Sequence, residues 1–218
     1  MELEPKTIRV MGALMEKART TPESYPLTLN SLVHACNQKT SRDPVTDYDE
    51  DEVLGALDAL REMGLVMRVD LAGSRTAKFR ENLSAQWELD AEEYALLATL
   101  FLRGAQTPGQ LRQRSDRMHP FADLQQVNDC LQRMQDREEE PLCLVRSLER
   151  TAGTKEIRWE HTFLPESAPA VGIMEETPLA PASIEEQPAS RIDQLEERLA
   201  AVENRLKAVE ELLHELND

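Results

Sequence analysis

Residues 49–80, DEDEVLGALDALREMGLVMRVDLAGSRTAKFR, carry the pattern of one helix followed by two short strands. The run opens with Asp49-x-x-Glu52, a spacing that caps helix starts, and apolar residues then recur at helical spacing until Gly64. Apolar and polar residues then alternate on both sides of a Gly73-Ser74 turn, and this alternation predicts a half-buried hairpin. Its expected buried side chains are Leu65, Met67, Val69, Ala77 and Phe79.

Two more helices are expected before this run. Apolar residues share one helical face from Ile8 to Ala18, and again from Leu29 to Cys36. Between them stands Thr21-Pro22, and threonine before proline suits an N-cap followed by the first helical position. Helix, helix, helix and hairpin is the order of a winged helix-turn-helix domain.

The same order recurs further along the chain. Asp90-x-x-Glu93 precedes an apolar helical face, and a second Thr-Pro step follows at Thr107-Pro108. A third helix is expected around Leu124–Met134, and two strands around 142–144 and 157–159. The same order of elements is less expected by chance in two segments than in one. The repeat therefore predicts an α+β, mainly helical fold with two tandem winged helix-turn-helix domains, at 1–86 and 87–164.

The C-terminal part has a different composition. Residues 165–190 hold five prolines and no lysine or arginine, which predicts a flexible linker. Residues 191–218 then repeat apolar side chains at alternating spacings of three and four, which predicts a coiled-coil helix. Its seam consists of Ile192, Leu195, Leu199, Val202, Leu206, Val209, Leu213 and Leu216.

Charges beside this seam favour a parallel pair of helices. With Ile192 at position a, Arg198 and Arg205 occupy g positions and face Glu203 and Glu210 at the e positions of a partner. A homodimer is favoured, although leucine at a and valine at d also suit higher oligomers. The alternative is a single amphipathic helix that packs on its own globular domain.

Composition excludes several classes of protein. No stretch approaches the roughly 20 apolar residues that span a bilayer, and the acidic N-terminus does not resemble a signal peptide, so a cytoplasmic location is expected. Cys36, Cys130 and Cys143 are odd in number and widely spaced, which favours buried free thiols over disulfides. The four histidines are isolated, and no CxxC, HExxH, phosphate-loop or Gly-x-Ser-x-Gly motif occurs. We therefore expect no metal, no cofactor and no catalytic site.

The distribution of charged residues along the chain does not match that of a typical DNA-binding protein. The net charge is −16, and residues 165–218 alone hold 13 acidic against 4 basic side chains. The third helix of the first segment begins with four consecutive acids, which phosphates would repel in a major groove. The basic residues that could contact phosphates lie on loops, wings and the second helix of segment two: Lys39, Arg42, Arg68, Arg75, Lys78, Arg80, Arg112, Arg114, Lys155 and Arg158. Alternatively, these are ordinary solvated side chains or partners of nearby acids.

A polar loop, NQKTSRDP at 37–44, is the best functional candidate in the globular part. Asn37, Gln38 and Asp43 could bind bases or a partner protein. They could equally form a turn network in which Asn37 caps one helix and Asp43-Pro44 sets the entry to the next.

Residues 21–45, TPESYPLTLNSLVHACNQKTSRDPV, and 103–121, RGAQTPGQLRQRSDRMHPF, closely resemble the bacterial YceH family. The resemblance covers about residues 5–164, and the terminal coiled coil is similar to that of family members. It implies a tandem winged-helix architecture and carries over no catalytic or binding residue; it singles out Tyr25, Pro26, Asn30, Cys36, Asn37, Gln38, Arg42, Asp43 and Pro44. Two hypotheses remain: a DNA-associated regulator that contacts phosphates through wings and loops, and a protein-interaction scaffold that binds no DNA.

Overall fold

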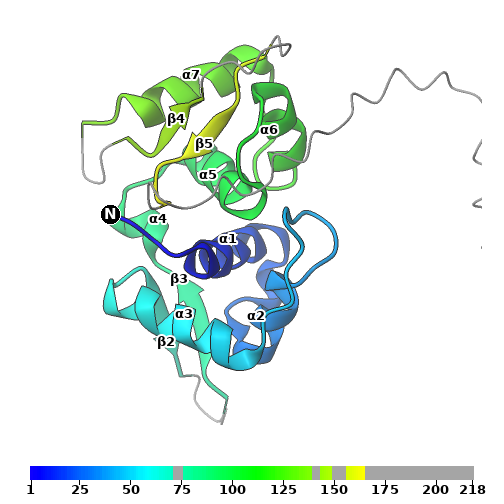
Figure 1. Cartoon of the computed structure of the whole chain (residues 1–218), viewed down its shortest axis with the longest axis vertical. Helices are drawn as coiled ribbons and strands as arrows, with labels where there is room; N and C mark the ends of the chain where they lie inside the picture. The colour runs from blue at the N-terminus through cyan, green and yellow to red at the C-terminus, as the bar shows by residue number, and fades with distance from the viewer. Residues whose placement is uncertain (71–75, 139–142, 149–155, 165–218) are drawn as a thin grey trace, which may run out of the picture. The chain divides into compact units, whose positions relative to one another are not determined.

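The chain folds into a mixture of helices and small antiparallel sheets, and a computed structural model describes residues 1–70, 76–138, 143–148 and 156–164 (Figure 1). The first half contains α1 (Pro5–Thr20), the 3-10 turn η1 (Pro22–Ser24), β1 (Leu27–Thr28), α2 (Leu29–Cys36), α3 (Glu50–Glu62), β2 (Val66–Val69) and β3 (Lys78–Glu81). After α4 (Leu83–Gln86), the second half contains α5 (Ala91–Arg103), α6 (Pro108–Ser115), α7 (Leu124–Gln135), β4 (Val145–Ser147) and β5 (Trp159–His161). The predicted linker and heptad helix, at 165–218, lie outside the described residues.

Three helices begin at capping boxes. In α3, the Glu52 amide donates to the Asp49 carboxylate at 2.8 Å, and the Asp49 amide donates to Glu52 at 3.2 Å. Asp90 with Glu93 caps α5 in the same way, and Thr107 with Gln110 caps α6. The predicted starts of these three helices are confirmed.

The first Thr-Pro step acts differently from the second. Thr21-Pro22 opens only η1, and the N-cap of α2 is Thr28, whose hydroxyl accepts from the Ser31 amide at 3.2 Å. The N-cap role expected of Thr21 is therefore wrong for α2. The reason is that β1, which pairs Leu27 with Phe79, keeps the chain extended before the helix begins.

Each half ends in an antiparallel hairpin. The first sheet has the order β1-β3-β2, with Arg68 opposite Phe79. In the second, β4 pairs with β5, and Gln106 and Trp159 exchange backbone hydrogen bonds at 2.9 and 2.8 Å. Gln106 thus stands just before α6 as β1 stands just before α2, which extends the repeat to a feature that the sequence did not predict.

The buried face of β2 differs from the expected one. Val66 is 3% exposed, whereas Met67, expected inside, is 41% exposed. The turn after α3 explains this, because Gly64 has a φ of +73° and the Leu65 amide donates back to the Leu60 carbonyl at 2.9 Å. Leu65 is therefore buried as part of the helix end, and Val66 is the buried residue of the strand, whereas Val69, expected inside, is half-buried.

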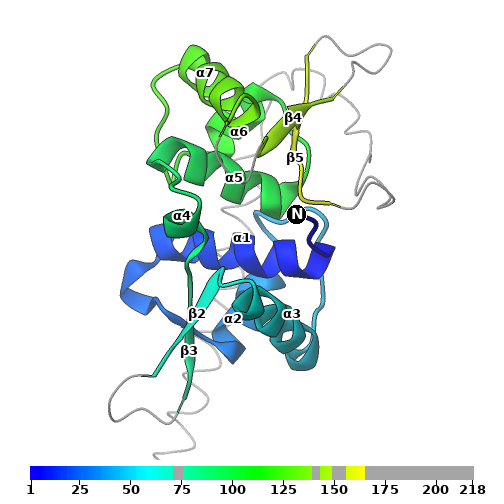
Figure 2. The ribbon, with the colours of Figure 1, turned by 90° about the vertical axis from the view of Figure 1, so that its left-hand side faces the viewer.

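The core of the described residues is built around the contact between α1 and α5, which lie side by side in both views (Figures 1 and 2). Every residue from Glu93 to Leu102 of α5 is buried, and so is every residue from Thr7 to Met15 of α1. The hydroxyl of Tyr94 donates to the Met15 carbonyl at 2.9 Å. One hydrophobic cluster therefore contains core residues from both sides of the domain boundary predicted at residue 86, and that boundary stays a prediction.

The N-terminal arm adds a second tie between the halves. The amide of Leu3 donates to the Phe163 carbonyl at 2.7 Å. The Phe163 ring stacks on Trp87, with ring centroids 4.9 Å apart. The last described residues are thereby held against the start of the chain.

Candidate binding surfaces and pocket

The basic residues expected on the first hairpin already contact their own neighbours. Arg68 pairs with Asp70 at 3.0 Å, and both side chains are more than half exposed. The Arg80 guanidinium lies 3.3 Å from the Met67 sulfur. Lys78 is half-buried, and Arg75 lies outside the described residues.

In the second half, the predicted phosphate contacts donate to backbone and amide oxygens. Arg112 donates to the Ala122 carbonyl at 2.7 Å and so ties α6 to the turn before α7. Arg114 donates to the Gln106 side chain at 3.1 Å, and Arg158 donates to the Ala105 carbonyl. Lys155 lies outside the described residues. The three arginines thus bond to nearby loop positions, at residues 105, 106 and 122.

Arg42 does not suit the phosphate contact predicted for it, because its side chain is fully buried. Its guanidinium forms two bonds to the Glu16 carboxylate, at 2.7 and 3.2 Å. It also donates twice to the Ala35 carbonyl at the end of α2, at 2.8 and 3.0 Å. Arg42 therefore locks the polar loop onto α1 and α2, while Lys39 beside it is exposed.

The polar loop forms a network of its own, which supports the turn interpretation of Asn37. Its side-chain amide donates to the Tyr48 carbonyl at 2.7 Å, and its oxygen accepts from the Tyr48 amide at 2.8 Å. Gln38 accepts from Lys17 at 3.4 Å. The backbone amide of Asp43 donates to the Leu102 carbonyl at 2.9 Å, so the loop also rests on α5.

A groove of about 610 Å³ runs between the N-terminal arm and α3. Its floor on α3 consists of the small residues Gly55, Ala56 and Ala59. Its walls carry the carboxylates of Glu2, Glu4, Asp51 and Glu52, against the single amine of Lys6. Lys6 pairs with Glu52 at 3.0 Å, so the groove keeps a negative excess.

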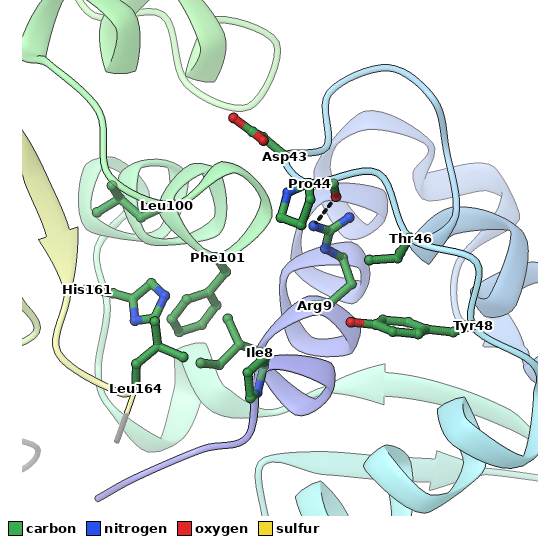
Figure 3. A pocket seen from close by; sticks show the side chains of 12 residues that line it. Ile8, Arg9, Asp43, Pro44, Thr46, Tyr48, Leu100, Phe101, His161 and Leu164 are labelled. Atoms are coloured by element: carbon green, nitrogen blue, oxygen red, sulfur yellow. Dashed lines mark hydrogen bonds between the residues drawn. The ribbon is translucent and has the colours of Figure 1, made fainter. Parts of the chain in front are cut away.

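A smaller pocket of about 80 Å³ lies where the polar loop meets α1, α5 and the end of β5 (Figure 3). The polar side chains that line it are Arg9, Asp43, Thr46, Tyr48 and His161. The apolar ones are Pro5, Ile8, Pro44, Leu100, Phe101 and Leu164. Asp43, which the sequence singled out, is thus brought together with residues far apart in the chain.

Arg9 is the cationic group of this pocket and is 4% exposed, whereas Asp43 is at an exposed position. It donates to the Pro44 carbonyl at 2.7 Å and to the Cys36 carbonyl at 3.3 Å. Cys36 ends α2, and the negative end of the helix dipole there favours a cation. Burial, and then the nearby charge of Arg42, lowers the pKa of Arg9. Its Nε atom is buried and has no hydrogen-bond partner among the residues that the structure describes.

His161 borders the same pocket as a neutral side chain. Burial lowers the pKa of His161 to about 4, so the imidazole carries no charge at neutral pH. Its Nδ1 accepts from the Phe163 amide at 3.3 Å, and its ring meets Phe101 edge-on with centroids 5.1 Å apart. Burial likewise raises the pKa of the Tyr48 hydroxyl, which stays protonated.

Sequence patterns did not single out Arg9 or His161 as site residues. Arg9 lies in a helix stretch that is buried on all sides, so helical periodicity did not separate it from its apolar neighbours. The signal available was a charged residue between Ile8 and Val10 inside that buried stretch. His161 needed the partner elements that only the fold brings to it.

Within the described ranges, the chain offers no cluster of three or more histidine, cysteine or carboxylate side chains that could hold a metal. In the same ranges, no helix has the length and apolar character needed to cross a membrane. Cys36 and Cys130 are buried free thiols, and Cys143 is a partly exposed one.

Comparisons with known proteins place the chain among bacterial relatives. A family model described as "Protein of unknown function, DUF480" matches residues 3–154. The chain is 44% identical to a UPF0502 protein of Koribacter versatilis over 174 residues, which is 78% of this chain and 79% of the relative. It is 42% identical to the UPF0502 protein YceH of Escherichia fergusonii over 181 residues, 81% and 83% of the two chains. An Azoarcus relative is 46% identical over 160 residues, 73% and 70%.

Proposed function

This chain belongs to the DUF480 family of proteins of unknown function and is 42% identical to the UPF0502 protein YceH. From its surfaces, we propose that it is a non-enzymatic protein-interaction scaffold. The scaffold consists of two winged-helix units in the cytoplasm. The C-terminal heptads join two copies as a parallel coiled coil. The partner is a protein segment that carries lysine or arginine.

The repeated element order supports the winged-helix assignment. α1, α2, α3 and the β2-β3 hairpin follow the order of such a unit, and α5, α6, α7 and β4-β5 repeat it. The additional strand contact just before the second helix occurs in both halves, at Leu27 and at Gln106. An unrelated pair of domains would have no reason to share that detail.

The observation that carries the scaffold role is the distribution of charge around α3. In a winged-helix unit, this helix would enter the major groove, yet its first turn holds Glu50, Asp51 and Glu52. The acidic groove lies directly beside that turn. Meanwhile Arg42, Arg112 and Arg158 donate to their own chain. These arginines are engaged within the chain, whereas the carboxylates around α3 face the groove. This distribution of charge suits a basic protein partner better than DNA.

The groove can be tested with a defined probe. We expect a 14-residue amphipathic helical peptide of leucine and lysine to bind the full chain, measured by fluorescence anisotropy in moderate salt. Gly55→Trp should weaken binding at least about tenfold, because a Cβ at Gly55 meets nothing within 4 Å and the indole would fill the groove floor. The matched control is Gly109→Trp, at an exposed position on α6, which leaves the net charge equally unchanged. Equal affinities for the two variants would mean that the peptide responds only to the overall charge.

The alternative is a DNA-associated regulator, and the basic side chains of the first hairpin favour it. Arg68 and Arg80 are exposed and Lys78 is half-buried, on adjacent strands. Random duplex DNA at 50 mM and 200 mM salt separates the two roles, because phosphate contact loses affinity steeply with salt. Salt-sensitive binding that the triple charge reversal of Arg75, Lys78 and Arg80 abolishes would replace the scaffold proposal.

The dimer has a test of its own. Truncation at Pro188 removes the predicted seam, and light scattering should then report a lower-order species than the full chain. A truncated chain with unchanged oligomeric state would remove the coiled coil as the assembly device.

A further inference from the structure

The pocket beside Arg9 has features that the scaffold role does not use. It is built from four separate parts of the chain: the start of α1, the loop at 43–48, the end of α5 and residues 161–164. The loop that forms one side is fixed by the Asn37 and Arg42 contacts and by the Asp43 amide. The pocket is therefore held open by ordered elements.

Arg9 brings a buried positive charge to this pocket, whose one lining carboxylate, that of Asp43, is at an exposed position. Among the residues that the structure describes, no carboxylate forms an ion pair with Arg9, and its two hydrogen bonds go to carbonyl oxygens. Burying a cation is costly unless it is paired and its donors are satisfied. The Nε atom has no partner among the described residues, so one donor of the guanidinium is unsatisfied in a side chain that is 4% exposed. An anionic group would satisfy both the charge and the donor.

The opposite side of the pocket is apolar. Ile8, Phe101 and Leu164 cluster together in Figure 3, and the carboxylate of Asp43 is drawn turned away from them. A ligand that reaches Arg9 would therefore place hydrocarbon on this cluster. His161 is uncharged and contributes no second cation.

Size restricts the ligand further. The cavity of about 80 Å³ is roughly half of the 150 Å³ that holds a benzene ring. A chain of about three to five carbons fits such a space. Larger anions such as nucleotides do not fit, and inorganic phosphate would leave the apolar side uncovered.

We propose that this pocket binds a short aliphatic carboxylate, with its carboxylate at the Arg9 guanidinium and its hydrocarbon on Ile8, Phe101 and Leu164. The same group can come as a free acid or as the C-terminal residue of a peptide. Binding at this pocket is independent of the acidic groove, so either proposal can fail without the other.

The test uses isobutyrate, the neutral isostere isobutyramide and N-acetyl-valine, titrated into the full chain with a ¹³C-labelled Ile8 methyl group. We expect a saturable shift of the Ile8 signal with isobutyrate, and affinity for isobutyramide about ten- to a hundredfold weaker, because a charge-assisted pair is lost. Tighter binding of N-acetyl-valine than of isobutyrate identifies a peptide terminus as the source, and the reverse identifies a free acid.

Leu164→Phe adds side-chain volume at the pocket and leaves Arg9 unchanged. It should abolish the ligand-induced shift of the Ile8 signal, while the methyl spectrum remains that of a folded protein. Arg9→Met should do the same, although it also removes the bonds to the loop, so Leu164→Phe is the deciding variant. The proposal is overturned if isobutyramide binds as well as isobutyrate, if Leu164→Phe keeps the affinity, or if no carboxylate produces a saturable shift.

Discussion

Replacing Gly12 by alanine probes the packing of α1 on α5. A Cβ at this position would lie 2.9 Å from the Phe101 Cβ and 3.0 Å from the Leu102 Cγ. Carbon atoms in contact prefer about 3.5–4.0 Å, and the Phe101 Cβ is fixed to the helix backbone. One of the two helices must therefore move by several tenths of an ångström to admit the methyl group.

Two opposing effects set the size of the change. Alanine is favoured over glycine inside a helix by about 0.5–1 kcal/mol. Overpacking a dense core costs about 1–3 kcal/mol. The second effect is the larger one here, so we expect Gly12→Ala to lower the free energy of unfolding by about 1–2 kcal/mol. Gly55→Ala is the matched control, because its Cβ would meet nothing within 4 Å and only the helix preference acts.

Urea denaturation followed by circular dichroism measures both variants against the parent chain. Gly55→Ala should raise the unfolding midpoint, and Gly12→Ala should lower it at an unchanged slope. If Gly12→Ala stabilised the chain as much as Gly55→Ala does, α1 and α5 would not approach as closely as described. The single core of the two halves would then be refuted.

Three more outcomes are expected. Arg42→Met should lower the free energy of unfolding in urea by about 3–5 kcal/mol, because Glu16 loses its buried partner. The control Arg61→Met, on the exposed face of α3, should lower it by less than about 1 kcal/mol. Similar decreases for the two variants would contradict the burial of Arg42. Burial lowers the pKa of His161 from 6.5 to about 4, so its contribution to stability is complete above pH 6.5 and is lost, by about 3 kcal/mol, as the pH falls to 4. His161→Phe should lack that part of the pH dependence of the unfolding free energy. If the variant and the parent chain showed the same pH dependence, protonation of His161 would have no effect on stability. Asn37→Ala removes both side-chain hydrogen bonds to Tyr48, so it should lower the free energy of unfolding by about 1–3 kcal/mol and speed hydrogen exchange of the backbone amides in the polar loop. Unaltered exchange rates would mean that other contacts keep the loop in place.

Local patterns in the sequence were enough to predict most of the helices. Caps such as Asp49-x-x-Glu52 depend on neighbours three residues apart, so they could be recognised without knowledge of the fold. Gly64 as the end of α3 is another local signal, since its positive φ suits glycine. The short helix α4 carried no comparable pattern in its four residues.

Features that depend on distant partners could not be predicted in this way. β1 has two residues and exists because Leu27 reaches Phe79, 52 positions later. The burial of Val66 in place of Met67 depends on the helix end at Leu65, where the Leu65 amide donates back to the Leu60 carbonyl. Arg42 resembled an exposed basic loop residue because nothing in the local sequence indicates that Glu16 lies beside it.

The same limit applies to the pocket. Asp43 and Pro44 were singled out within an unusual loop, but Arg9, Phe101 and His161 meet that loop only through the packing of α1 on α5. Residues 7–15 of α1 are buried on all sides, so helical periodicity offers no exposed face that would separate Arg9 from its neighbours.

The pairing of α1 with α5 has a consequence for synthesis on the ribosome. About 80 residues separate the end of α1 from the end of α5, which takes roughly 4–16 s at typical elongation rates. Throughout that interval, the side chains of α1 that pack on α5 have been made but α5 is incomplete, although α2 and α3 are already available to the rest of α1 once they are made. A nascent chain of this protein thus keeps part of the apolar surface of α1 without its α5 partner for seconds, and transiently exposed surface of this kind is what chaperones bind.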